Sequence, residues 1–173
     1  AGAPAGRWVV AAGARRERVA GGGTVARAAR LGLTDAEARP GGLGRVGTGD
    51  PITAADLTQV VARQLPATSG GVRASGDPAS VVRRLAVCGG AGDDLFETAV
   101  AAGADAYLTA DLRHHAASEA PEGLVLLDAS HWATEWPWLP TAAQALARVV
   151  NVQTSVSALC TDPWTTASRS NQP

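Results

Sequence analysis

One imidazole and one carboxylate in the segment 123–135, GLVLLDASHWATE, have the spacing of a metal site. His131 and Glu135 are four residues apart, so one helical turn brings both side chains onto the same face. They follow an apolar strand ending at Asp128, which is where open α/β sheets bind their ligands. Both side chains can therefore bind one divalent ion, or the carboxylate can bridge two. An exposed ion pair between them fits the same spacing.

The preceding segment, ADAYLTADLRHHAASEA at 104–120, also predicts a strand that ends in polar residues. Asp111 can cap the turn that follows, or it can orient a metal ligand or contact a substrate. His115 is a candidate acid, base or substrate-binding residue, because histidine titrates near neutral pH. His114 is interpreted as a surface residue.

A glycine-rich turn, VCGGAGDD at 87–94, joins a predicted strand to a helix in the layout of a phosphate-binding loop. Its glycine spacing is neither G-x-G-x-x-G nor G-x-x-x-x-G-K-[ST]. Asp93 and Asp94 would also repel an anion at the start of the helix. The turn therefore argues against a Rossmann dinucleotide site, and Cys88 is interpreted as a packed apolar residue.

Composition narrows the class of protein. With 173 residues, 46% of them apolar, the chain can build one hydrophobic core. The net charge of -1 argues against a nucleic-acid binder. The sequence contains no apolar run of about 20 residues, the length that would predict a membrane span. Two distant cysteines suggest a reducing, cytoplasmic setting. All three histidines lie in 93–135 with nine acidic residues and one arginine, which suits a divalent cation or a solvated acidic surface.

The alternation of strand and helix patterns from residue 72 onward predicts a layered αβα fold with a mixed, mostly parallel sheet. Strands are expected at 8–12, 81–88, 104–110, 123–129 and, at the edge of the sheet, 152–159. Helices are expected at 24–33, 53–65, 93–103 and 141–150, with a helical turn near 112–120. A glycine-rich connector is expected at 41–49. Helix 53–65 and the strand segments 84–88, 106–108 and 124–127 should form the core.

Three motifs together resemble the carboxyl-terminal half of the NIF-three-like dinuclear-metal-centre proteins, also named type 2 GTP cyclohydrolase I homologues. They are LAVCGGAGDD, GADAYLTADLRHH and LLDASHWATE, within 81–135. LGLTDAEARPGGLGRVG upstream and ALCTDPWT near the end extend the resemblance over 24–165. It divides the chain into a poorly matched segment, 1–23, and an α/β domain, 24–173.

The resemblance implies a metal-dependent hydrolase in which His131 and Glu135 bind a pair of divalent ions, of zinc, iron, manganese or magnesium. Asp111 and His115 match the family's second motif near the site. Ala110 replaces a glycine of that motif, at a position where a permissive backbone is expected. The implied substrate is a small, nucleotide-like molecule, and the implied assembly is a ring-shaped homo-oligomer such as a hexamer.

The amino-terminal segment departs from the family pattern. No histidine precedes His114, and Arg18 falls where the family has an acidic ligand, with Glu17 as the nearest substitute. Two protein ligands do not hold two ions, so we expect the site to be incomplete unless upstream residues complete it. The alternatives are a non-catalytic metal-binding or protein-interaction module of the same fold, or a nucleotide-binding domain without metal.

Overall fold

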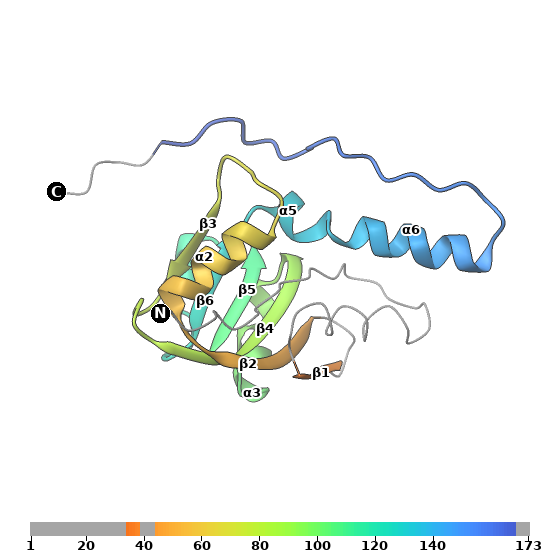
Figure 1. The fold of residues 1–173 in the computed structure, drawn as a ribbon. Helices are drawn as coiled ribbons and strands as arrows, with labels where there is room; N and C mark the ends of the chain where they lie inside the picture. Colours follow the sequence, from red (N-terminus) through yellow and green to blue (C-terminus); the bar gives the residue numbers. More distant parts are fainter. Residues whose placement is uncertain (1–33, 39–43, 169–173) are drawn as a thin grey trace, which may run out of the picture.

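A computed structural model describes residues 34–38 and 44–168 of the chain (Figure 1). Within these residues six strands form one sheet in the order β1-β2-β4-β5-β6-β3. The strands are β1 (Thr34–Ala38), β2 (Arg45–Thr53), β3 (Val72–Ser75), β4 (Val81–Ala91), β5 (Ala106–Ala110) and β6 (Val125–Ala129). The helices are α2 (Ala54–Gln64), the 3-10 helix η1 (Asp93–Leu95), α3 (Phe96–Ala101), α4 (His114–Ser118), α5 (His131–Glu135) and α6 (Trp138–Val149).

The sheet is mixed, with a parallel centre. β5 pairs in parallel with both β4 and β6, whereas β1, β2 and β3 join by antiparallel pairing at the two sides. The predicted α/β fold with a mixed sheet is confirmed. Parallel pairing at the centre means that β4, β5 and β6 all end at the same edge.

Helices cover both faces of the sheet, which makes three layers. Along β5, Ala106 and Leu108 pack toward α2 and α5, whereas Tyr107 between them packs toward α3. Figure 1 shows α2 lying across one face of the sheet. Leu57 and Val61 of α2 are fully buried there. The predicted core is thus confirmed, because the strands are buried on both faces.

Helix α2 begins and ends as the sequence predicts. The Thr53 hydroxyl accepts a hydrogen bond from the backbone N–H of Asp56 at 3.1 Å and donates to its carboxylate at 2.8 Å. This exchange satisfies a backbone donor that the first helical turn leaves free. The helix ends before Pro66, which cannot supply a backbone N–H.

The glycine-rich connector predicted at 41–49 is wrong from Arg45 onward, because strand β2 begins there. β2 lies between β1 and β4, so its backbone groups find partners on both sides, and Val46 is buried against Ala86. Gly44 precedes the strand with φ +70°, and a Cβ there would lie 2.7 Å from the Val87 carbonyl oxygen. This glycine lets the chain enter the sheet.

The edge strand predicted at 152–159 is also wrong. These residues run as extended chain without strand pairing (Figure 1). The edge of β6 is instead taken by β3, which pairs with it antiparallel from Val72 to Ser75. The strand predicted at 8–12 and the helix predicted at 24–33 lie outside the described residues.

Helix α6 begins at Trp138, before the predicted start at residue 141. Pro137 caps it with φ -57°, a value that suits the first turn of a helix. In the part of the chain that the structure describes, no helix has both the length and the apolar character to cross a bilayer.

Tyr107 is expected to resist ionisation in the folded protein. It is buried, and its hydroxyl donates to the Gly92 carbonyl oxygen at 3.0 Å. Burial raises the pKa of Tyr107 far above its ordinary value, because a phenolate would lose its hydration. Since it is the only tyrosine, ultraviolet absorbance reports on this single group. We expect a titration midpoint well above that of the urea-unfolded chain; identical midpoints, with the fold retained by circular dichroism, would contradict the structure.

Candidate functional site

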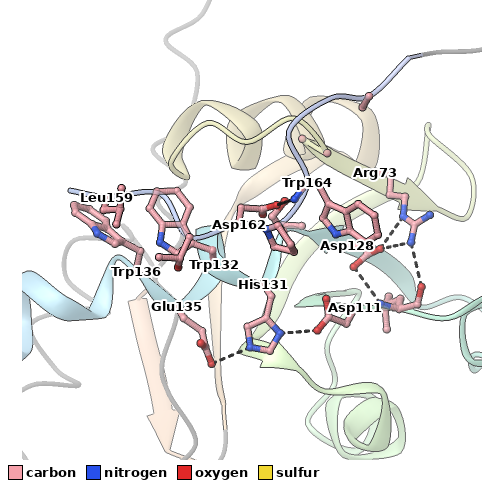
Figure 2. Close-up of a pocket in the computed structure, with 18 of the residues that line it drawn as sticks. Arg73, Asp111, Asp128, His131, Trp132, Glu135, Trp136, Leu159, Asp162 and Trp164 are labelled. Atoms are coloured by element: carbon pink, nitrogen blue, oxygen red, sulfur yellow. Dashed lines mark hydrogen bonds and ion pairs between the residues drawn. The ribbon is translucent and has the colours of Figure 1, made fainter. Parts of the chain in front are cut away.

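The carboxyl ends of the three parallel strands bring the candidate residues together (Figure 2). Gly90 lies at the end of β4, Asp111 directly follows β5, and His131 opens helix α5 after β6. Two in-register pairs between β5 and β6, Thr109 with Asp128 and Ala110 with Ala129, set the relative height of the last two strands. The site is thus built on the rigid centre of the sheet.

His131 is held between two carboxylates. Its Nδ1 atom lies 2.5 Å from Oδ2 of Asp111, and its Nε2 atom lies 3.4 Å from Oε1 of Glu135 (Figure 2). The three side chains are about half exposed. The hydrogen bond that Asp111 accepts from Nδ1 raises the pKa of His131, partial burial opposes that rise, and the charge of Glu135 adds to it. His131 and Glu135 lie on the same face of α5, as their spacing predicts.

Asp111 has a special backbone conformation. Among the described residues it is the one non-glycine residue with a positive φ, at +59°. Aspartate tolerates this left-handed region better than most residues. Ala110, where we expected the permissive backbone, lies instead in β5 and is fully buried. The turn that aims the carboxylate at His131 is therefore made by Asp111 itself.

The free edge of the imidazole faces a space that a glycine leaves open. A Cβ on Gly90 would lie 2.8 Å from Oε1 of Glu135 and 3.1 Å from Nε2 of His131, and its φ of +71° also favours glycine. Two ligand atoms bound at about 2.1 Å to one tetrahedral ion are about 3.4 Å apart. The separation of Nε2 and Oε1 matches that geometry.

The position of Gly90 is fixed by two buried threonines. Its N–H donates to Oγ1 of Thr134 at 2.9 Å, and its carbonyl oxygen accepts from Oγ1 of Thr109 at 2.8 Å. Both threonine side chains are almost fully buried, so leaving their hydroxyls without a partner would cost about 1–3 kcal/mol each. These contacts hold the glycine against the two candidate ligands.

These residues fit one divalent ion better than two. His131 and Glu135 supply two donor atoms, while Asp111 is engaged on the far nitrogen of the same ring, as a carboxylate that orients a metal-bound histidine would be. Within 44–168 no group of three or more His, Cys, Asp or Glu side chains is placed to hold an ion. Glu17 and Arg18 lie outside the described residues.

His115 is not brought next to this group. It lies on α4 and is exposed to solvent. Its ring is edge-on to that of His114, and the two ring centroids are 5.4 Å apart. Asp128, at the end of β6, is engaged elsewhere, because it forms an ion pair at 2.6 Å with Arg73 of β3. No local pattern singles out Arg73, because its pairing with Asp128 is set by the β3–β6 register.

A cleft of about 1240 Å³ adjoins His131 and Glu135 (Figure 2). One wall comes from α5 and the start of α6, and the other from the extended segment 157–167. The tryptophans that line it are Trp132, Trp136, Trp138 and Trp164. Sequence reasoning overlooked them, although the Trp136-Pro137-Trp138 break and the PWT sequence at 163–165 were visible signals.

An α/β sheet with a histidine and a glutamate converging at the end of its central strands is the arrangement expected of the family that the motifs resemble. The family model of Duf34/NIF3 (NGG1p interacting factor 3) matches residues 18–163. The chain belongs to this family.

Individual relatives agree with the assignment. A GTP cyclohydrolase 1 type 2 homolog of Streptomyces coelicolor is 49% identical over 140 residues, which cover 76% of this chain and 49% of the relative. A homolog of the same name from Mycobacterium leprae is 46% identical over 133 residues, covering 74% and 34%. The crystal structure of a Bacillus cereus protein related to NIF3 is 31% identical with a TM-score of 0.66, covering 73% and 36%. The chain thus spans half or less of the length of these relatives.

Replacing Asp111 with asparagine is expected to lower the pKa of His131. Asparagine also tolerates a positive φ, so the turn should survive while the negative charge is lost. Without the carboxylate hydrogen bond, the imidazolium loses its main stabilisation. Proton NMR titration of the three histidines in chelator measures the effect, with His114 and His115 as internal controls. An unchanged His131 midpoint would show that the contact with Asp111 is absent in solution.

Proposed function

We propose that this protein is a metal-dependent hydrolase whose described residues bind a divalent ion through Nε2 of His131 and Oε1 of Glu135. The observation that carries the proposal is the convergence of these two atoms on the space beside Gly90. Asp111 holds Nδ1 of the same ring, which keeps the Nε2 lone pair directed at the ion. Zinc, iron, manganese or magnesium would suit this mixed nitrogen and oxygen set.

A complete site of two ions would need donors beyond the residues that the structure describes. Bound there, the ions would supply Lewis acidity for the hydrolysis of a C–N or phosphoester bond. The chain's own contribution is to position the two ligand atoms, Nε2 of His131 and Oε1 of Glu135, with Asp111 holding the far nitrogen of the imidazole. The name of the relatives, GTP cyclohydrolase 1 type 2 homolog, favours a nucleotide such as GTP as the substrate.

The partners that we propose are a small, nucleotide-like substrate and further copies of this chain. Helix α6 supports self-association, because none of its residues is buried and Leu146 and Val149 are 47% and 74% exposed. A ring such as a hexamer follows from the resemblance, and a cytoplasmic location follows from the two distant cysteines; both belong to the same proposal.

A non-catalytic module of the same fold is the second candidate. The observation that favours it is the small number of metal ligands, because the described residues offer only two donor atoms, enough to hold one ion. Such a module would bind an ion or a protein partner without turning over a substrate.

Metal titration tests the proposed site. Calorimetric titration with Zn²⁺ or Mn²⁺ should show binding that is lost in His131→Ala, which removes one ligand atom, and weakened at least about tenfold in Glu135→Gln, which replaces a charged oxygen with a neutral one. Gly90→Ala should also abolish binding, because its Cβ would occupy the space between the two ligand atoms. His114→Ala, with an exposed ring on α4, is the matched control.

Turnover separates the two candidate functions. With GTP as the trial substrate, hydrolysis should require the divalent ion, stop on addition of chelator and return when the ion is restored. Tight ion binding without turnover of any nucleotide would favour the non-catalytic module. Absence of ion binding by the intact protein would reject the hydrolase.

A further inference from the structure

The cleft beside His131 has the chemistry of an aromatic binding site. All four tryptophans of the described residues line it, and Figure 2 shows Trp136, Trp132 and Trp164 spread along the cleft above His131. Trp132 packs against the core, and its ring centre lies 6.1 Å from that of Trp136. These two indoles form a wall that is already in place on the body of the protein.

Trp164 lies on the opposite wall of the cleft, in the extended segment 157–167. Hydrogen bonds join its segment to the body, among them one from the Ser69 hydroxyl to the Trp164 carbonyl oxygen and one from Nε1 of Trp136 to the Ser157 carbonyl oxygen at 2.8 Å. The Trp164 residue is nevertheless 71% exposed. An indole held at the rim of a cleft while remaining open to water is available to stack on a ligand.

The charges that line the cleft select among aromatic ligands. Its carboxylates are Asp111, Asp128, Glu135 and Asp162. The lining includes one guanidinium, Arg73, which already donates to Asp128 at 2.7 Å and to the Leu112 carbonyl oxygen at 3.1 Å. Without bound cations this surface repels anions, so a neutral ring is favoured over a phosphate at the tryptophans.

We propose that this cleft binds a neutral, planar heteroaromatic ring by stacking against Trp132 and Trp164, beside the His131–Glu135 pair. The class of ligand is a nucleobase or a ring of similar size. This inference deepens the proposed function and rests on it for the assignment of the ring to the substrate. The binding of the ring itself involves no metal and can be measured separately.

Calorimetric titration in chelator tests the ring site, with guanosine and adenosine as neutral probes and ribose as the control without a ring. We expect saturable binding of both nucleosides, none of ribose, and weaker binding of adenosine monophosphate than of adenosine. Trp164→Ala should weaken nucleoside binding at least about 5-fold, which is the lower limit for one stacked base. Trp164→Phe keeps a ring face and should restore much of the affinity.

Val100→Ala, an exposed apolar change on α3 outside the cleft, is the matched control and should bind as the unmodified protein does. Circular dichroism should show Trp164→Ala to be folded, because the side chain contributes little to the core. The proposal is overturned if nucleosides do not bind, or if Trp164→Ala binds them with unchanged affinity. If the protein binds nucleosides but no divalent ion, the proposed hydrolase function is rejected and the proposed ring site is retained.

Discussion

The parallel pairing of β4, β5 and β6 is the constraint on which the candidate site depends. It brings Gly90, Asp111 and His131, which are far apart in the sequence, to one edge of the sheet. A slip of one residue between β5 and β6 would move Asp111 by about 3.3 Å, more than the whole 2.5 Å contact with His131. The apolar side chains that lock this register on both faces therefore act on the geometry of the polar site as well.

Polar groups inside the sheet set the finer positions. Thr109 and Thr134 are the two buried polar residues of the described core, and both bond to the backbone of Gly90. Hydrophobic packing alone is tolerant of small shifts, whereas a buried hydroxyl must keep its partner within hydrogen-bond distance. The distance between the glycine backbone and the two candidate ligands is thus held by directional contacts.

Much of this arrangement could be predicted from the sequence, because periodicity reports the strands, the capped helix α2 and the four-residue spacing of His131 and Glu135. Features that depend on pairing between segments far apart in the sequence could not be predicted. The glycine pattern of 41–49 indicates a connector, because the neighbours of β2 in the sheet, β1 and β4, are not visible in the local sequence. Residues 152–159 have a strand pattern, but β3 occupies the edge of the sheet beside β6. The family motif has a glycine at the position of Ala110 and so predicts a permissive backbone there, but Ala110 is the last residue of β5 and the positive φ falls on Asp111.

The extended segment after α6 has a kinetic consequence. It forms a wall of the cleft, yet the hydrogen bonds that tie it to the body are isolated ones and none belongs to a strand ladder. Detaching it leaves the sheet and its core intact, so the free energy of that local opening is only a small part of the free energy of global unfolding. Amide protons of 157–167 should exchange with solvent far sooner than those of β5, and molecules should enter and leave the cleft on the timescale of this opening.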